Sequence, residues 1–435
     1  MNEVAPRRVW GLAVLLLAAN TFSFIDRTLL TLLVAPIRAD LGVSDTVISL
    51  LHGLAFASLY AVMGLPLGQW ADRGDRPRLM AAGVALWSGM TVASGAAGSV
   101  TALAFARAGV AVGEASLSPA AVSLLAERMP RRLVARAIAL FQSGIFLGSA
   151  AALMVGGGLL RWLEGVNPAS LGPLAGVAPW RVVFFAVGAP GLIIAALLLL
   201  VREPRRGSPG VGDRPAHVPL RDTLAYVSAR RGAYGWHVMA FTAITVLAYG
   251  AMAWMPTTLV RTFGVSTADA GVWLGAILMV AAPLGVIASG ALVDSQLQRG
   301  RGDGPIRVAL GGLTLLALAI PAYALAPSLG MALAVYVPLA FALGFPYGIA
   351  SGALALITPP HLRGQVTALY LLISNLIGLS LGPLLVALMT DRVFHRDAAV
   401  RYSLAWLPIL TVPIAAVALV RARAPYAQAW REASR

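Results

Sequence analysis

Four ionisable side chains interrupt long apolar segments of this chain: Asp26, Arg27, Arg107 and Glu114. A charge at the centre of a bilayer costs about 2.5–3.5 kcal/mol on insertion scales, so such groups are expected to face the protein interior and to pair. Arg107 and Glu114 are seven residues apart, nearly two helical turns, and therefore project from one face of a helix. A carboxylate beside two arginines stays ionised until its pairing changes. This is chemistry suited to carrying a proton, with Glu114 as the first candidate and Asp26 as the second.

The arrangement around Arg27 supports the same interpretation. Asn20, Arg27 and Thr31 form a polar stripe at i, i+7 and i+11, and Asp26 points about 100° away from it. A static ion-pair network that only orients helices is the alternative. The functional interpretation is favoured because all four charges lie in the N-terminal half, whereas a structural device would more naturally occur in both halves.

The composition indicates what kind of element must hold these charges. Hydrophobic residues make up 59% of the 435 residues, charged residues 12%, and the mean hydropathy is +0.80. An ordinary globular domain has about 25% charged residues, so a soluble protein is excluded and a polytopic membrane protein remains. The net charge of +15 comes from arginines that lie mostly between apolar segments, which does not indicate a nucleic-acid partner. The chain has no cysteine, which excludes disulfides and thiolate metal sites; no metal or cofactor is expected.

The fold class predicted from these segments is all-α, with twelve transmembrane helices in two six-helix halves. At about 20 residues per span, the apolar segments fall at 10–36, 46–70, 78–98, 101–126, 134–160, 181–201, 236–260, 268–293, 306–326, 329–357, 364–389 and 402–421. The predicted domains are an N-terminal bundle at 1–201, a cytoplasmic linker at 202–235 and a C-terminal bundle with its tail at 236–435. Leu220, Leu224 and Val227 have helical spacing and predict a short amphipathic helix on the membrane surface.

Arginine placement predicts the orientation. With the N-terminus inside, 24 arginines lie on the cytoplasmic side and seven on the other. Because cytoplasmic loops carry the excess of basic residues, both termini are predicted to be cytoplasmic. The expected location is the inner (plasma) membrane, and the first span is expected to be retained because no cleavage-site pattern follows it.

A repeated motif connects the two halves. Gly68 and Asp72 close the second span, and Gly290 and Asp294 close the eighth, 222 residues later; Gly53 and Gly275 have the same offset. Ala139-Leu140-Phe141 is echoed by Ala368-Leu369-Tyr370 at an offset of 229 residues. Echoes at nearly constant offset across a six-plus-six pattern are typical of two halves related by a parallel repeat.

The segment Gly68-x-x-x-Asp72-Arg73-Gly74-Asp75-Arg76 resembles the loop motif of the major facilitator superfamily. Three further stretches resemble its spinster-like branch: Phe24-Ile25-Asp26-Arg27, Arg107 through Glu114-Ala115-Ser116 to Pro119, and Trp180 through Phe184. An anion:cation symporter branch shares the Asp-Arg pair, but there Pro usually follows Glu-Ala directly. Here Ser116 intervenes, which favours the spinster-like branch.

This resemblance implies a secondary transporter that works by alternating access and exports amphipathic substrates such as lysophospholipids or sphingoid lipids. It places spans one and four beside a central cavity, where Arg27 could reach Glu114. It also implies that Asp72, with Arg73 and Arg76, latches the halves against span eleven near Pro360; a basic loop that only sets topology is the alternative. The proton is the expected coupling ion, the bilayer and a small amphipathic molecule the expected partners, and a monomer the expected state.

Other functions stay open. Uptake of a small organic anion and efflux of drugs are alternatives within the superfamily. A membrane receptor or enzyme is disfavoured because the sequence has no large soluble domain and no catalytic cluster.

Weaker candidates complete the prediction. A set of polar and aromatic residues could line the C-terminal half of a cavity or could simply pack: Tyr249, Tyr347, Tyr370, Ser374 and Asn375. His52 is expected at a cavity rim and His237 at the membrane interface. Gly144, Gly148 and Gly156-Gly157-Gly158 in the fifth span are expected to permit close helix packing, with a hinge at this place as the alternative.

Overall fold

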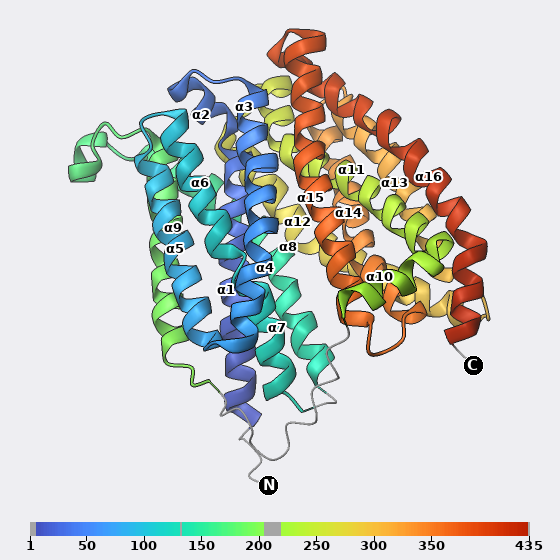
Figure 1. Cartoon of the computed structure of the whole chain (residues 1–435). Coiled ribbons are helices and arrows are strands. Elements are labelled where there is room, and N and C mark those ends of the chain that lie inside the picture. The colour runs from blue at the N-terminus through green and yellow to red at the C-terminus, as the bar shows by residue number, and fades with distance from the viewer. Residues whose placement is uncertain (1–5, 131–132, 204–218, 434–435) are drawn as a thin grey trace. The chain divides into compact units, whose positions relative to one another are not determined.

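The computed structural model describes residues 6–130, 133–203 and 219–433, and these residues are almost entirely helical (Figure 1). Twelve helical segments in the described residues are long and apolar enough to cross a membrane. The predicted all-α, twelve-span fold is therefore confirmed.

The helices before the linker are α1 (Pro6–Leu32), α2 (Val34–Leu41), α3 (Asp45–Leu50), the π-helix η1 (Leu51–Ala55), α4 (Phe56–Arg73), α5 (Arg76–Ala96), α6 (Val100–Glu114), α7 (Leu117–Arg128), α8 (Val134–Gly165), the 3₁₀-helix η2 (Pro168–Leu174) and α9 (Pro179–Leu199). Those after it are α10 (Leu220–Ala229), α11 (Arg231–Phe263), α12 (Thr267–Gln298), α13 (Gly304–Ala324), α14 (Leu329–Ile357), α15 (Arg363–Leu388), the π-helix η3 (Met389–Phe394), the 3₁₀-helix η4 (Asp397–Ala399) and α16 (Val400–Ala433).

The chain divides into two compact units, each built from its own helices. Unit 1 comprises Met1–Val211 and Val265–Ala276, and unit 2 comprises Gly212–Gly264 and Ile277–Arg435. The first turns of α12 therefore belong to unit 1, where Arg161 at the end of α8 pairs with Asp269.

Close backbone approach holds α1 against α8 in unit 1. A Cβ atom on Gly144 would lie 3.0 Å from the Asn20 side chain, and one on Gly148 would lie 2.7 Å from Phe24 Cβ. Distances this short leave no room for a side chain, so these glycines set how near the two helices come. The packing role predicted for Gly144 and Gly148 is confirmed.

In unit 2, α11 is the central helix and packs against α15 and α16. A Cβ on Gly250 would lie 2.8 Å from the Gly382 carbonyl oxygen, and Trp254 Nε1 donates to the Pro383 carbonyl oxygen at 2.9 Å. The bond to Pro383 satisfies the polar atom of a Trp that is only 2% exposed.

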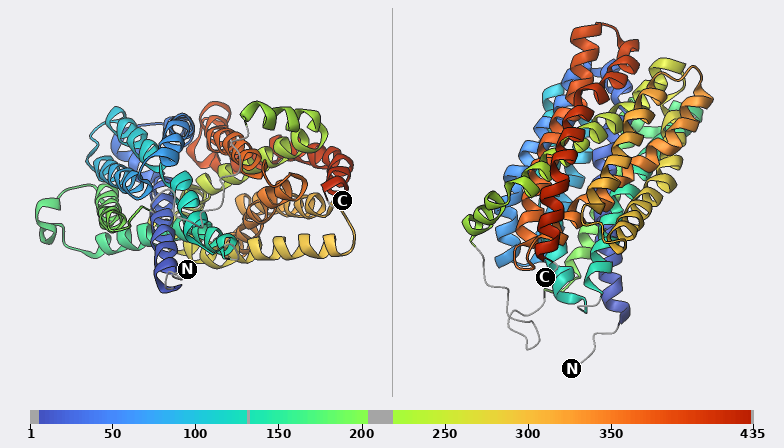
Figure 2. Two further views of the ribbon diagram at one scale, coloured as in Figure 1. Left: turned by 60° about the horizontal axis from the view of Figure 1, so that its bottom comes forward. Right: turned by 90° about the vertical axis from the view of Figure 1, so that its right-hand side faces the viewer.

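The helix α10 lies beside α11 and α15 (Figure 2). Thr223 is buried and donates to Gln365 Oε1 at 2.5 Å, while Leu220 and Leu224 are 52% and 49% exposed. A polar residue thus faces the protein and two apolar ones face outward, as a helix on a membrane surface requires. Residues 204–218 of the predicted linker lie outside the described residues.

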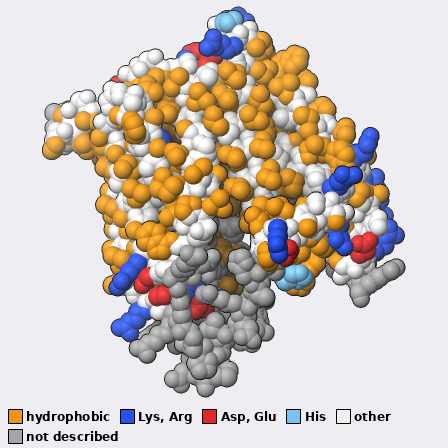
Figure 3. Space-filling view, viewed as in Figure 1, with side chains coloured by type: hydrophobic (Ala, Val, Ile, Leu, Met, Phe, Trp, Pro, Cys, Tyr) orange, Lys and Arg blue, Asp and Glu red, His pale blue; other side chains and the backbone are white. Residues whose placement is uncertain are grey.

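The surface fits a protein embedded in lipid. Figure 3 shows mainly hydrophobic side chains over the visible helices, with charged side chains gathered toward helix ends. Exposing Leu, Ile and Val side chains over such a surface costs little free energy only where the surroundings are apolar, as they are in the core of a bilayer.

Candidate functional site

Two charges predicted to meet do so in unit 1. Arg27 on α1 donates from Nε to Glu114 Oε2 on α6 at 2.5 Å, and Ser23 Oγ donates to the same oxygen at 2.8 Å. Glu114 is 1% exposed, whereas the Arg27 side chain is 18% exposed. Ser23 precedes Arg27 by four residues and so shares its helix face. The carboxylate is therefore held by two donors from one turn of α1.

Aromatic rings surround the cationic partner. The Arg27 guanidinium carbon lies 4.9 Å from the ring centroids of Phe24 and Phe56 and 4.7 Å from that of Tyr60. A guanidinium at these distances from ring faces is attracted by their quadrupoles. The rings stabilise Arg27 without supplying a competing negative charge, so Glu114 is the carboxylate that pairs with it in this structure.

Arg107 and Asp26 complete the buried charges of this site. Arg107 donates from Nη1 to the backbone carbonyl oxygen of Asp26 at 3.2 Å, and its guanidinium carbon lies 5.6 Å from the Phe56 centroid. Asp26 is 2% exposed and lies within electrostatic reach of both Glu114 and Arg107. Two carboxyls and two guanidiniums thus form one coupled group, and both guanidiniums contact aromatic rings of α4.

This group retains hydrogen-bonding capacity. Within the described residues, four of its buried atoms have no hydrogen-bond partner: Asp26 Oδ1, Glu114 Oε1, Arg107 Nε and Arg107 Nη2. Buried polar atoms are normally paired, and exceptions call for a functional or structural explanation. The site therefore has two reactive features. Two carboxyl oxygens can take a proton, and the guanidinium beside them can bind an anion.

The described hydrogen bond of Asn20 goes to α8 and not to Arg27, so its predicted role as a partner of the substrate or of the buried charges stays a prediction. Asn20 Nδ2 donates to the Phe141 carbonyl oxygen on α8 at 2.8 Å, and Thr31 Oγ1 donates to its own helix at Thr28. Helical spacing alone could not show this, because α8 lies so close to α1 that it takes the bond from Asn20. The residues that sequence reasoning missed are Ser23, Phe24, Phe56 and Tyr60; only Ser23 and Phe24 had a signal, their proximity to Arg27 on α1.

The polar residues predicted for the C-terminal half all lie in unit 2 but do not form one cluster. Tyr249 donates to Asn375 Oδ1 at 3.1 Å, and Ser374 shares a hydrogen bond with Thr242 at 2.9 Å. Tyr370 is 5% exposed and packs among aromatic rings, while Tyr347 is 38% exposed. Tyr249 and Asn375 thus interact directly, and Tyr370 lies within hydrogen-bonding reach of Ser374.

His237 is not at an interface. It is fully buried, its Nε2 lies 3.1 Å from the Ala350 carbonyl oxygen, and its ring lies 4.5 Å from Phe241 and 5.8 Å from Tyr370, centroid to centroid. The prediction failed because α11 begins at Arg231 and places His237 nearly two turns inside the helix. His52 lies in η1 and is half-buried.

Arg76 of the loop motif is fully engaged inside unit 1. It donates to Glu203 Oε1 from Nε at 2.8 Å, to Glu127 Oε2 from Nη2 at 2.5 Å and to Ser123 Oγ at 3.0 Å. Its backbone N–H also donates to Glu203 at 3.0 Å. The described bonds of Arg76 therefore join α5 to α7 and to the residues after α9, and not one half to the other as predicted. Neither Glu127 nor Glu203 was singled out from the sequence, since both lie in arginine-rich stretches.

The remaining motif residues give less information. The side chains of Asp72 and Arg73 lie outside the described part of the chain. Gly68 and Gly290 have open space where a Cβ would be, and Asp294 is exposed. The latch predicted for Asp72 and Arg73 stays a prediction. In the described residues, no group of three or more His, Asp or Glu side chains is placed to hold a metal ion.

Comparison with known proteins identifies the family. The model of the Major Facilitator Superfamily matches residues 16–428. An "MFS-type efflux pump" of Mycolicibacterium smegmatis is 31% identical over 89% of this chain and 85% of its own. The Drosophila melanogaster "Protein spinster" is 26% identical over 89% of this chain, which spans 63% of that protein. A crystal structure of a bacterial homologue of the human lysosomal transporter Spinster, inward-facing and unoccupied, is 29% identical with a TM-score of 0.81, over 99% of this chain and 98% of that one.

The chain belongs to the major facilitator superfamily and, within it, to the spinster-like branch. It is accordingly a multi-pass membrane protein and a secondary transporter, not an enzyme.

Proposed function

We propose that this transporter uses the proton gradient to export an amphipathic, lipid-like molecule of the lysophospholipid or sphingoid type by alternating access. The observation that carries the coupling proposal is the buried carboxylate of Glu114, held by Arg27 at 2.5 Å and by Ser23. A carboxylate so placed is released whenever its cationic partner is drawn away, and a released buried carboxylate gains a proton rather than stay charged. Asp26, next to it, is the second carrier.

The substrate class is proposed from chemistry and from relatives together. Arg27 and Arg107 suit an anionic or zwitterionic head, and the aromatic rings around Arg27 suit an apolar body. Spinster proteins of Drosophila melanogaster and Rattus norvegicus are 26% identical to this chain. The protein is proposed to act as a monomer in the inner membrane with both termini cytoplasmic, with the proton as its only coupling species and without a cofactor.

A second candidate is efflux of drug-like compounds; the 31% identity to a protein described as an "MFS-type efflux pump" favours efflux without indicating what is exported. Uptake of small organic anions is a third, since a "Probable L-galactonate transporter" of Escherichia coli is 25% identical over 66% of the chain. Proteoliposomes offered lysolipid, a cationic dye or a sugar acid separate the three: the proposal requires gradient-driven movement of lysolipid and fails if only the dye or the sugar acid moves.

Proton coupling is tested by Glu114→Gln, which keeps size and hydrogen bonding but cannot ionise. We expect transport driven by an imposed pH gradient to collapse while substrate exchange without a gradient persists. The melting temperature should fall, because Arg27 loses its charged partner, but the protein should still fold, because Arg27 keeps a hydrogen-bond acceptor and the aromatic rings around it. Asp26→Asn in parallel identifies the second carrier. A stable Glu114→Gln protein with intact gradient-driven transport would show that Glu114 does not carry the proton.

A further inference from the structure

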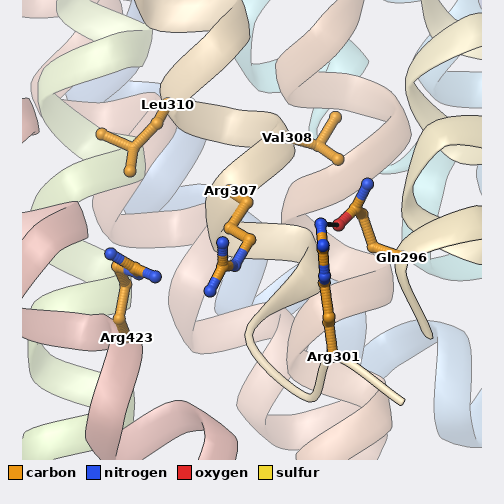
Figure 4. A pocket seen from close by; sticks show the side chains of 6 residues that line it. All are labelled: Gln296, Arg301, Arg307, Val308, Leu310 and Arg423. Carbon is orange, nitrogen blue, oxygen red and sulfur yellow. Dashed lines mark hydrogen bonds between the residues drawn. The ribbon is translucent and has the colours of Figure 1, made fainter. Parts of the chain in front are cut away.

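A second concentration of charge lies in unit 2. A cavity of about 380 Å³ opens there, lined by Gln296, Arg301, Arg307, Val308, Leu310 and Arg423 (Figure 4). Arg307 lies in the first turn of α13, Arg423 near the end of α16, and Arg301 in the α12–α13 loop. The arginine counts assign this end of the helices to the cytoplasm.

A single carboxylate positions two of these arginines. Asp303 accepts from Arg307 Nε at 2.8 Å through Oδ1 and from Arg423 Nε at 2.9 Å through Oδ2. Both bonds use the Nε atom, so in the described structure the terminal amino groups of both guanidiniums remain available for another acceptor. Because each guanidinium is fixed at one edge, less side-chain entropy is lost when an anion binds the other edge.

The third arginine is fixed by the loop that carries it. Arg301 donates from Nη1 to Gln296 Oε1 at 2.9 Å, the bond drawn in Figure 4, and its backbone N–H donates to the Gln296 carbonyl oxygen at 3.1 Å. A Cβ on the next residue, Gly302, would lie 2.6 Å from the Trp430 ring. The loop is thus packed directly on α16 and keeps Arg301 beside the cavity.

The cavity carries excess positive charge. Three arginines face one carboxylate, and although partial burial alone would raise the pKa of Asp303, hydrogen bonds from Arg307 and Arg423 hold that pKa below its ordinary value. Asp303 is therefore ionised at neutral pH and offsets one of the three charges. Phosphate oxygens match the planar donor fork of arginine, and the negative charge of a phosphate would offset the positive charge that Asp303 leaves unbalanced.

The helices beyond the arginines favour a lipid over a free ion. Along α13, Leu318 follows Arg307 by eleven residues, about 16 Å of helix, and is 67% exposed. On α16, which packs against α13, Val417 and Val420 precede Arg423 and are 54% and 56% exposed. Phosphate-binding side chains at the end of exposed apolar helix faces fit a molecule with an anionic head and acyl chains.

We propose that the cavity bounded by Arg301, Arg307 and Arg423 binds the phosphodiester head group of an anionic phospholipid, whose acyl chains lie along α13 and α16. Basic pockets between helices on the cytoplasmic side take head groups of this kind. The site is independent of the transport proposal, because it lies in unit 2 and shares no residue with the charges around Glu114.

The test uses the full chain in nanodiscs of phosphatidylcholine with increasing phosphatidylglycerol, and native mass spectrometry counts the phosphatidylglycerol retained per protein. The variant Arg307→Gln/Arg423→Gln should weaken retention by about fivefold for each arginine lost. The matched control is Arg299→Gln/Arg421→Gln, which removes two exposed arginines at the same end that do not line the cavity. The control should retain phosphatidylglycerol as wild type does.

Three results would overturn the proposal: equal losses in both double variants, no loss in either, or displacement of phosphatidylglycerol by millimolar inorganic phosphate, which would indicate a free-anion site. If Arg307→Gln/Arg423→Gln fails to fold in neutral detergent, Arg301→Gln replaces it, since Arg301 does not contact Asp303, and a loss of about fivefold is expected. Glu114→Gln should retain phosphatidylglycerol fully, so failure of one proposal does not imply failure of the other.

Discussion

The two units handle charge in opposite ways. In unit 1, Asp26, Arg107 and Glu114 are buried, and at the start of α5 one arginine, Arg76, is held between two carboxylates. In the described residues of unit 2, the buried polar side chains are uncharged groups of Ser, Thr and Tyr together with His237. At the start of α13 one carboxylate, Asp303, is held between two arginines that are about 40% exposed.

The difference separates two tasks. Buried charges that can be paired and released suit proton transfer, and unit 1 has them; a neutral interior suits packing and contact with an uncharged part of a substrate, and unit 2 has that. The cluster at the start of α5 has two carboxylates for one arginine, and the Arg76 guanidinium is hydrogen-bonded to groups of its own unit. The cluster at the start of α13 has more arginines than carboxylates and leaves positive charge for an external partner.

The largest expected effect tests the cluster in unit 1. Arg76→Ala leaves Glu127 and Glu203 facing each other without their cation, and breaking a buried pair in this way costs about 3–5 kcal/mol. We expect a fall of many degrees in melting temperature in neutral detergent. The control is Arg78→Ala, two residues away, whose side chain is 80% exposed and whose loss should be nearly neutral.

A further variant shows whether Arg76→Ala lowers the melting temperature because it removes a charge or because it leaves empty space. Arg76→Met with Glu127→Gln and Glu203→Gln removes all three charges together and should recover most of the loss, since a buried ion pair can be replaced by neutral groups at little cost. If Arg76→Ala melts as Arg78→Ala does, the Arg76 cluster contributes nothing to stability and the contrast between the units is wrong at this point.

A smaller effect tests whether the interior of unit 2 is neutral. His237→Phe keeps the ring among Phe241, Tyr370 and Tyr426 but removes the hydrogen bond to the Ala350 carbonyl oxygen. That oxygen still accepts from its own helix, α14, so the loss should cost about 0.5–1.5 kcal/mol. We expect a lower melting temperature with gradient-driven transport retained. Loss of gradient-driven transport in a folded His237→Phe protein would place proton chemistry in unit 2 and break the comparison; His361→Gln, at an exposed histidine, is the control.

Much of the fold could be predicted because hydropathy reports on each helix separately. The tenth span, Leu329–Ile357, has the predicted bounds, and the eleventh begins one residue from its predicted start. The last span was predicted as 402–421 but runs from Asp397 to Ala433, because α16 continues as a helix past Arg421 and Arg423 after its apolar run has ended. Hydropathy measures how apolar a segment is, and a helix does not have to stop where that property does.

Predictions about the site succeeded where two residues had strong reasons to pair and did not reach the contacts that a third helix provides. Arg27 and Glu114 meet because buried opposite charges have few other partners, and the expectation did not depend on exact helix rotation. Asn20 is a neutral donor that any nearby carbonyl satisfies, and a single sequence does not show that Phe141 lies beside it. The partners of Arg76 were hidden for the same reason, since Glu203 follows the sixth span and meets α5 only through tertiary packing.

The smallest expected effect concerns Asp303 and sharpens the contrast with Arg76. Because Arg307 and Arg423 lower its pKa in the folded state, Asp303 contributes stability above the ordinary aspartate pKa of about 3.9, and that contribution is lost as the pH falls through the lower folded value. Asp303→Asn should therefore destabilise the protein at pH 7, by less than about 1 kcal/mol because both arginines are partly exposed to screening solvent. The difference from wild type should begin to shrink as the pH falls through the ordinary aspartate pKa of about 3.9 and should disappear only below the folded pKa, which is lower still. Melting curves in neutral detergent between acidic and neutral pH measure it, and Asp294→Asn, at an exposed carboxylate, is the control variant. A destabilisation as large as that of Arg76→Ala, or one that persists in acid, would mean that Asp303 supports the fold as a structural link and that its arginines are not held ready for an outside anion.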